Sequence, residues 1–388
     1  MRYKLEKDKL SDEFKFLLSL IAHSKENKFN SEMNWELFVR LVRHHRLYPV
    51  VYGDIQSIGE RELPNFVIAE LKEEYSRNTF KMFALTGEMD RVNKLFAENS
   101  IRSLILKGPP LAQTLFGDVS RRTSKDLDIL VPVENFEQVN EILMQDGYIP
   151  KKKFVPDILG DWKRRRHHLS YFNPKKQVQI EIHWRMNPEM GCEPSFEDLW
   201  LRRQKSNLTG SDIFLLSNED LFSYLIMHGA RHGWFRLRWL LDIHYLLSVK
   251  NINWRSVSDG FIKNGQQAIA GQTLILLHSL FKTEVPLEME YLLDARKSAV
   301  LAERAMLFII GTSDVSVDSE DRDLVREYQR YLFAIKTSKQ KWEYVRERLL
   351  PNSYDANTLY LPRTLHFLYY PLRPFLWFWR RVKEQLTT

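Results

Sequence analysis

The chain has 388 residues and a formal net charge of +7, with 44% hydrophobic and 28% charged residues. This composition is ordinary for a folded, soluble protein, and the length allows two or three domains with a sizeable core. The single cysteine, Cys192, excludes an internal disulfide framework and favours a reducing compartment. The first residues lack the apolar core of a signal peptide, and no segment has the roughly 18 apolar residues of a membrane span. We therefore expect a cytoplasmic protein.

The positive charge is concentrated in three short runs: "KKK" at 151–153, "KRRRHH" at 163–168 and "RPFLWFWRRVK" near the C-terminus. A basic surface attracts any polyanion, including nucleotides, nucleic acid and phospholipid head groups. A single basic run is nevertheless more typical of a solvated face than of a binding site. Nucleic acid is therefore an alternative partner that the charge does not favour.

Helical periodicity characterises the first quarter of the chain. Residues 11–97 carry apolar side chains at helix spacing, for example in "FKFLLSLIAHS" and "NWELFVRLVRHHRL". We predict an N-terminal helical region over residues 1–98.

The pattern then changes to short runs rich in Ile, Leu and Val, which predict strands at 103–107, 126–133 and 178–184. Between the first two runs, "PPLAQTLFGD" predicts a short helix that begins at its prolines, because a first helical turn tolerates proline. The segment 134–148 predicts a second helix, which ends at Gly147.

This order predicts an α+β (mixed α/β) fold, in which a small sheet over residues 99–190 has helices on one side and helical segments of both termini around it. Helical spacing returns after the core, and Ser217 with Asp220 forms an N-cap pattern before "NEDLFSYLIMHGARHG". We predict a C-terminal helical domain over 191–350 and an aromatic, basic strap over 351–388.

Two aspartates stand where the second predicted strand begins, in "SRRTSKDLDILVPV". Side chains on a strand alternate between faces, so Asp126 and Asp128 project together, while Leu127 and Ile129 point into the opposite layer. Two like charges this close repel each other unless a cation lies between them, and carboxylates are preferred ligands of Mg²⁺. Taken alone, the pair is more typical of two solvated acids at the start of a strand.

A third acid, Glu181, lies in the middle of the apolar strand "VQIEIHW". An unpaired acid in a central strand costs several kcal/mol, and a metal shared with the two aspartates would satisfy it. Upstream, "LILKGPP" places Lys107 and Gly108 at a turn between a strand and a helix. Backbone N–H groups at a helix start can hold phosphate, although a simple strand-to-helix turn is the favoured interpretation of "KGPP" by itself.

Together these segments resemble a known family. "LKGPPLAQTLFGDVSRRTSKDLDILVPV", followed by "IEIHWRM" and "HGARHGWFRLRWLLDIHYLL", is similar to bacterial nucleotidyltransferases of the DNA-polymerase-beta superfamily over roughly residues 35 to 250. The most specific parts are "RRTSKDLDILV" and "IEIHW". The superfamily usually has Gly-Gly or Gly-Ser at the phosphate turn, whereas this chain has Gly108 followed by Pro109.

The resemblance implies a small polymerase-beta-like sheet and a metal-dependent enzyme. Asp126 and Asp128 would be the metal-binding pair and Glu181 the third acid, all three of them catalytic, with Mg²⁺ or Mn²⁺ as the cofactor. The candidates for binding the nucleotide are Lys107, Gly108, Arg122 and Ser124. The alternatives are a surface position for Lys107, a carboxylate partner for Arg122 and a simple turn role for Ser124.

The function that follows is transfer of a nucleotidyl group from a nucleoside triphosphate, with ATP as the expected nucleotide. The acceptor is a hydroxyl or phosphate on a protein, a small molecule or an RNA end. The alternatives are an inactive scaffold that binds nucleotide or nucleic acid, and a membrane-surface accessory protein of a polysaccharide or peptide pathway. We expect loss of either aspartate to abolish transfer without harming the fold.

Several conspicuous residues are interpreted as structural. His228 and His232 are four residues apart, but Gly229 stands where a zinc protease signature requires Glu, so packing beside the cleft is favoured. We interpret His183 as a structural residue on the opposite face of its strand from Glu181, and Cys192 as an inert thiol.

The C-terminal strap is rich in aromatic and basic residues, which suits the head-group region of a membrane. Prolines 362, 371 and 374 should interrupt any long amphipathic helix there. We therefore favour a strap packed on the helical domain, with peripheral membrane contact as the alternative.

Overall fold

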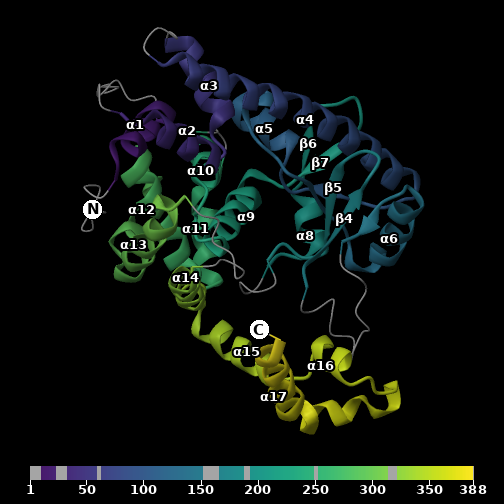
Figure 1. Ribbon diagram of the computed structural model, residues 1–388. Helices are drawn as coiled ribbons and strands as arrows, with labels where there is room; N and C mark the ends of the chain where they lie inside the picture. Colours follow the sequence, from purple (N-terminus) through teal and green to yellow (C-terminus); the bar gives the residue numbers. More distant parts are fainter. Residues whose placement is uncertain are drawn as a thin grey trace.

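The computed structural model describes residues 10–22, 33–58, 63–151, 166–187, 193–248, 252–312 and 321–387. Cys192 and most of the basic stretch from 151 to 168 lie outside these ranges. The fold is α+β, as predicted: one mixed sheet is flanked by helices from both ends of the chain (Figure 1). In the described part of the chain, none of the helices combines the length and the apolar character needed to cross a membrane.

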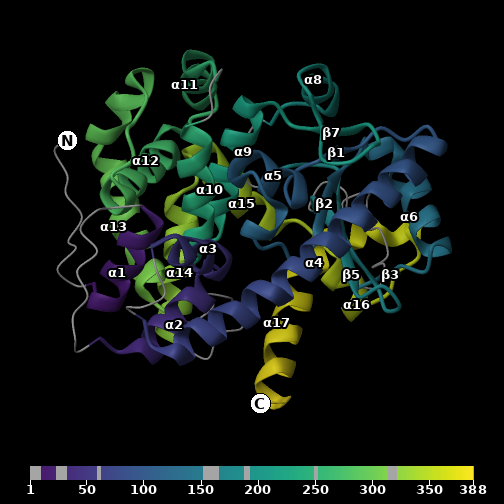
Figure 2. The same ribbon diagram turned by 90° about the horizontal axis from the view of Figure 1, so that it is seen from above.

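The described residues of the N-terminal region form four helices, as the periodicity predicts. They are α1 (Asp12–Ile21), α2 (Trp35–His44), α3 (Tyr48–Ile58) and α4 (Asn65–Glu98). Figure 2 shows the long helix α4 passing from α2 and α3 to the sheet. The N-terminal half of α4 packs with α2 and α3, and its C-terminal half supplies Met82, Leu85 and Met89 to the core beneath the sheet.

The C-terminal half of the chain is also helical. Its helices are α8 (Phe196–Leu201), α9 (Asn218–Arg231), α10 (Leu237–Leu247), α11 (Trp254–Lys263), α12 (Gln267–Phe281), α13 (Arg296–Ile310), α14 (Arg322–Ala334), α15 (Ser338–Leu349), α16 (Ser353–Thr358) and α17 (Tyr369–Thr387). The side chain of Ser217 caps α9 by accepting a hydrogen bond from the N–H of Asp220. Helices α9, α10, α12 and α13 share one hydrophobic core with α1 to α3, so the two ends of the chain are packed together.

The sheet has seven described strands. In spatial order they are β3 (Ile149–Pro150), β4 (His168–Asn173), β5 (Val178–His183), β2 (Leu127–Leu130), β1 (Leu104–Ile105), β7 (Ile213–Leu215) and β6 (Gln204–Ser206). The central pairs differ in direction, because β2 is parallel to β5 and antiparallel to β1. Strands β6 and β7 extend the sheet beyond the predicted end of the core at residue 190.

The two faces of the sheet have different environments. Leu127 and Ile129 of β2 lie in the core with Ile180 and Ile182 of β5, under α4 and α6 (Phe136–Gln145). This arrangement agrees with the predicted alternation on β2. The opposite face carries the acids and faces α9 and α10. Helix α5 (Pro109–Phe116) follows the end of β1.

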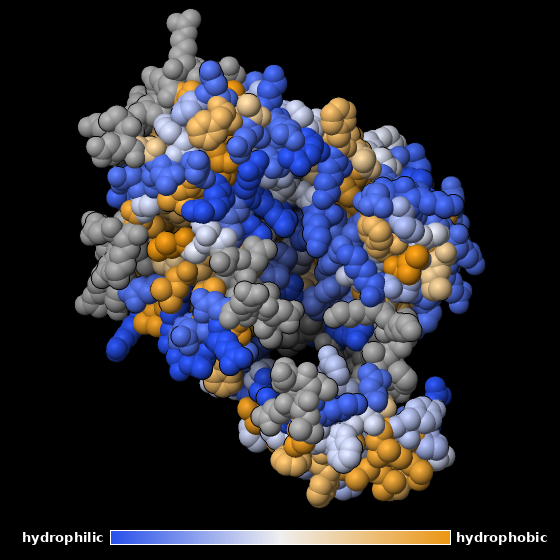
Figure 3. Space-filling view, in the orientation of Figure 1, coloured by the Kyte–Doolittle hydropathy of each residue, from blue (hydrophilic) through white to orange (hydrophobic). Residues whose placement is uncertain are grey.

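The C-terminal arm, residues 351–387, touches the helical domain at α15, where Arg373 donates to the backbone carbonyl of Arg348 over 3.2 Å, but it is not part of the core of that domain. Helices α16 and α17 bury Ala356, Tyr369 and Leu376 in a small core of their own. Figure 1 shows the arm extending away from the main body, and in Figure 3 apolar side chains gather on it.

The expectation that prolines would prevent a long helix in this arm is wrong, because α17 runs for 19 residues through two of them. Pro371 lies in the first turn, where the N–H has no helical partner, and Pro374 removes only a single hydrogen bond from the helix interior.

Candidate functional site

The three acids meet on the floor of a cleft of about 430 Å³ between the sheet and helices α9 and α10. Strand register brings two of them together, because Asp128 of β2 is directly paired with Glu181 of the parallel strand β5. Ligand atoms of Asp128, Glu181 and His183 all lie within 4.8 Å of one another. Asp126 precedes β2 by one residue and lines the same cleft. The spacing pattern therefore identified a real convergence of acids.

Asp128 is the most enclosed of the three acids, with a side chain only 2% exposed. It is paired with the ammonium group of Lys107, and the Nε2 atom of His183 lies 3.2 Å from its Oδ1. Burial alone would raise the pKa of this carboxyl, but Lys107 and His183 outweigh it and hold the pKa well below its ordinary value. Asp128 is thus ionised at neutral pH even without a metal.

Asp126 has weaker partners. The Nζ atom of Lys107 lies 3.7 Å from its Oδ1, and the amide of Gln179 donates to its Oδ2 over 3.4 Å. Burial raises the pKa of Asp126, and the negative charges of Asp128 and Glu181 add to this effect, although Lys107 opposes it. A divalent cation would relieve this repulsion and favour the ionised form.

Glu181 is held in place by its neighbours in the sheet. Ser170 of β4 donates to its Oε1 over 3.1 Å, and Gln179 donates to the same oxygen over 3.0 Å. Burial would raise the pKa of Glu181, but the hydrogen bond with His183 and the nearby His168 lower it to about 2. A carboxylate this acidic is suited to binding a cation or orienting a hydroxyl, and poorly suited to accepting a proton.

The interpretation of His183 as a residue on the opposite face from Glu181 is wrong. His183 comes two residues after Glu181, so strand alternation places both on the same face. The Nε2 atom of His183 lies 3.7 Å from Oε2 of Glu181, and the neighbouring carboxylates raise its pKa despite burial. His183 therefore belongs to the site.

The start of strand β4 and the residue before it add two histidines that the strand analysis missed. His168 is paired with His183 across the β4–β5 ladder, with stacked rings 4.9 Å apart, and its Nε2 lies 3.7 Å from Oε2 of Glu181. His167 precedes β4 and accepts a hydrogen bond from Arg231 over 3.0 Å. Burial lowers the pKa of His168 to about 4, so its imidazole is neutral at pH 7. The signal was present in "KRRRHHLSYF", where alternation begins at the second histidine.

The other walls of the cleft are basic. Arg46, Lys125, Arg231 and Arg238 line it together with Lys107. Arg122, in contrast, is buried in a pair with Asp242 and is not among the lining residues, which favours the alternative of a carboxylate partner. Ser124 lines the cleft, and its hydroxyl donates to the backbone carbonyl of Asp126 over 2.9 Å, as a turn residue does.

The turn at Gly108 differs from a phosphate cradle. Gly108 has φ +106°, a conformation that strains any residue with a side chain, so glycine is required there. The next two residues, Pro109 and Pro110, open α5 and have no N–H groups. The helix start therefore offers fewer donors to a phosphate than the sequence pattern suggested, and the basic side chains of the cleft are the main cationic groups.

His228 and His232 line the cleft and have the packing role that was predicted. Their rings lie 4.8 Å apart, and each contacts the indole of Trp239, at 5.4 and 5.1 Å. Gly229 is needed for packing, because a Cβ there would lie 2.1 Å from the ring of Trp234. Neither histidine belongs to a group of potential metal ligands in the described part of the chain.

Two overlapping groups of side chains could hold a cation. One joins Asp128 and Glu181 with His183, and the other joins His183 with His167 and His168. The carboxylates suit Mg²⁺ or Mn²⁺, and an imidazole within the group suits Mn²⁺ better than Mg²⁺. The residues present therefore fit a divalent cation.

A family model described as an uncharacterised nucleotidyltransferase matches residues 31–282 of this chain. The matched part contains the sheet, the three acids, and helices α9 and α10. No curated protein matches the chain. The family match confirms that the chain is related to nucleotidyltransferases.

Proposed function

The chain belongs to the uncharacterised nucleotidyltransferase family, and from this premise we propose that it transfers a nucleotidyl group from ATP to an acceptor hydroxyl. The observation that carries the proposal is the pairing of Asp128 with Glu181 in adjacent strands, beside Asp126, in a cleft with basic walls. A pair of carboxylates that binds a cation, next to several fixed positive groups, suits a nucleoside triphosphate.

Asp126, Asp128 and Glu181 would hold the divalent cation. When bound, the cation would neutralise phosphate charge and align the reacting oxygens. The low pKa of Asp128 and Glu181 keeps both carboxylates ready to bind it at neutral pH. Glu181 orients the acceptor hydroxyl, because Ser170 and Gln179 fix its carboxylate.

The triphosphate would lie along the basic wall. Arg46 comes from the turn after α2, Arg231 from the end of α9 and Arg238 from α10, so three separate elements supply positive charge to one cleft. Fixed cations of this kind stabilise the charge that develops on the leaving pyrophosphate. Lys107 already lies between the two aspartates and would contact a phosphate oxygen next to them.

The test is incubation of the full-length protein with ATP labelled at the α-phosphate, Mn²⁺ or Mg²⁺, and cell extract. We expect Asp126→Asn and Asp128→Asn to lose transfer, and Glu181→Gln to lose turnover more than nucleotide binding. Asp212→Asn is the matched control, because Asp212 is exposed and paired with Lys205 on β6. Transfer at the wild-type rate by the double aspartate variant would refute the proposal.

A further inference from the structure

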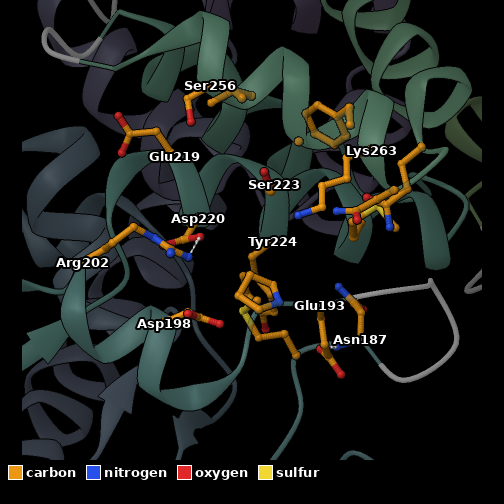
Figure 4. A pocket seen from close by; sticks show the side chains of 18 of the residues that line it. Asn187, Glu193, Asp198, Arg202, Glu219, Asp220, Ser223, Tyr224, Ser256 and Lys263 are labelled. Carbon is orange, nitrogen blue, oxygen red and sulfur yellow. Dashed lines mark hydrogen bonds and ion pairs between the residues drawn. The ribbon is translucent and has the colours of Figure 1, made fainter.

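A second and larger cavity, of about 800 Å³, adjoins the cleft. It lies between α9, α11, the pair Met186–Asn187 and residues 193–202, and Figure 4 shows its polar side chains converging from these parts of the chain. Tyr224 of α9 lines both this cavity and the cleft of the three acids. A molecule in the cavity would therefore reach the cleft at Tyr224, beside the position proposed for the triphosphate.

Asn187 in the wall of this cavity carries an unsatisfied hydrogen-bond acceptor. The residue is only 7% exposed, and its Oδ1 has no partner among the described residues. The backbone N–H of Asn187 donates to Glu193 over 2.7 Å, which fixes the residue in position. A buried acceptor without a partner costs about 1–3 kcal/mol, and a ligand with a hydrogen-bond donor would remove this cost.

The charges of the lining indicate which ligands fit. Among the described residues, four carboxylates line the cavity: Glu193, Asp198, Glu219 and Asp220. The cationic groups of the same described lining are Arg202, which is paired with Asp220 at 3.0 Å, and Lys263. This excess of acid repels anions, whereas the cleft beyond Tyr224 carries an excess of basic side chains.

We propose that this cavity binds the acceptor, a neutral or cationic small molecule that presents hydroxyl or amino donors. The proposal rests on the proposed nucleotidyl transfer. An acceptor hydroxyl oxygen bonds to the α-phosphorus of ATP, the bond from that phosphorus to the bridging oxygen breaks, and pyrophosphate leaves. The hydroxyl proton passes to solvent, and the products are the nucleotidyl-acceptor and pyrophosphate.

Gly260 of α11 allows a test that fills the cavity. It lines the cavity, and a Cβ built on it would meet no atom within 4 Å, so Gly260→Phe would place a ring in open space. Gly87 of α4 also has no atom within 4 Å of a built Cβ, and it lies outside the cavity lining. Gly87→Phe is therefore the matched control for the same change in a helix.

The experiment uses α-labelled ATP with the small molecules of a cell extract, separated by ion exchange into anionic, neutral and cationic fractions. We expect wild type and Gly87→Phe to label the neutral or cationic fraction, and Gly260→Phe to label it at least tenfold less while binding ATP equally well. Asn187→Leu should raise the acceptor concentration needed for half-maximal transfer at least fivefold and leave ATP binding unchanged.

Three results would overturn the inference while leaving nucleotidyl transfer intact. They are label in the anionic fraction, label in protein or RNA instead of small molecules, and equal transfer by Gly260→Phe and wild type. Loss of ATP binding by Gly260→Phe would also count against it, because the cavity would then belong to the nucleotide. If wild type transfers label to none of the fractions, the proposed function itself fails.

Discussion

Arg122 and Asp242 form a buried ion pair that ties the entry to β2 to helix α10, across 120 residues of sequence. Nε and a terminal nitrogen of Arg122 donate to the two carboxylate oxygens of Asp242, over 2.8 and 2.9 Å. Both side chains are almost completely inaccessible to water. The pair holds the chain segment that leads to Asp126 against the helix that carries Arg238, so it connects two of the elements that line the cleft.

Asp242→Ala should destabilise the protein by about 3–5 kcal/mol, because it leaves the buried guanidinium of Arg122 without a carboxylate to balance its charge. Replacing both members, as Arg122→Met with Asp242→Leu, should cost less than the single change. Chemical denaturation measures the free energy of unfolding of each variant. Glu197→Ala removes an exposed partner of Arg102 and is the control, with little expected change. Equal stability of Asp242→Ala and wild type would show that the pair is dispensable.

The two aspartates of the site should differ in their effect on the fold. The sequence suggested that either could be removed without harm, but Asp128 is 2% exposed and is the main partner of Lys107 and His183, whereas Asp126 is 15% exposed. Asp128→Ala leaves the buried ammonium group of Lys107 with only the more distant carboxylate of Asp126, 3.7 Å away, and should lose about 2 kcal/mol or more. Asp126→Ala removes repulsion and should be close to neutral. Thermal unfolding of the metal-free variants checks this order, and a larger loss in Asp126→Ala would contradict it.

The parts of the site that could be predicted are those that depend on local periodicity. Strand alternation alone places Asp126 and Asp128 on one face of the sheet. Glu181 lies in the middle of an apolar strand, where a carboxylate needs a partner. The same alternation places His183, which comes two residues after Glu181, on the face of the sheet that carries the acids. Helices α4 and α9 could be predicted equally well, because their apolar spacing and the cap at Ser217 are local signals.

The remaining parts depend on contacts between distant segments. Strand β4 follows a basic run, and its strand character depends on pairing with β5, so His168 and Ser170 were not expected in the site. Strands β3, β6 and β7 have only two or three residues each, too few for a periodic signal. The buried pairing of Arg122 with Asp242 depends on how α10 packs against the segment before β2. The spacing of residues in the strand region does not indicate this packing.

Glu88 of α4 should make stability depend on acidic pH. Burial would raise its pKa, but hydrogen bonds from Arg91, Tyr148 and Lys176 outweigh burial and lower the pKa to about 2, against 4.5 for the ordinary group. Because the folded pKa is the lower one, the stabilisation is complete above pH 4.5 and is lost as the pH falls towards 2. Between pH 6 and pH 3, wild type should lose about 2 kcal/mol more than Glu88→Gln. Urea titrations across this pH range measure the free energy of unfolding of both proteins. If this free energy falls equally with pH in wild type and Glu88→Gln, Glu88 does not have the proposed role.

The C-terminal arm should bind anionic membranes. Phe375, Trp377, Phe378 and Trp379 of α17 are each at least half exposed, and Arg381 follows them on the same helix. Aromatic and basic side chains together suit the head-group region of a bilayer. Binding of the full chain to vesicles containing phosphatidylglycerol should weaken roughly tenfold for Trp379→Ser, because burying an aromatic ring contributes about 1.5 kcal/mol or more. Vesicle flotation measures the binding. Trp342→Ser, which replaces an exposed tryptophan of α15, is the control. Identical binding by the two variants would show that the arm does not contact the membrane.

His183 should make the site prefer Mn²⁺ to Mg²⁺. Its imidazole lies with the carboxylates of Asp128 and Glu181, within 4.8 Å, and nitrogen ligands favour Mn²⁺ over the harder Mg²⁺. We expect His183→Asn to weaken Mn²⁺ binding by about tenfold or more while changing Mg²⁺ binding little. Titration followed by the electron paramagnetic resonance signal of free Mn²⁺ measures the affinity, and competition with Mg²⁺ gives the second value. His232→Asn is the matched control, because His232 lines the same cleft but is outside both ligand groups. Equal loss of Mn²⁺ affinity in the two variants would mean that His183 acts through the general charge of the cleft. An unchanged Mn²⁺ affinity in His183→Asn would show that the imidazole is not a ligand of the cation.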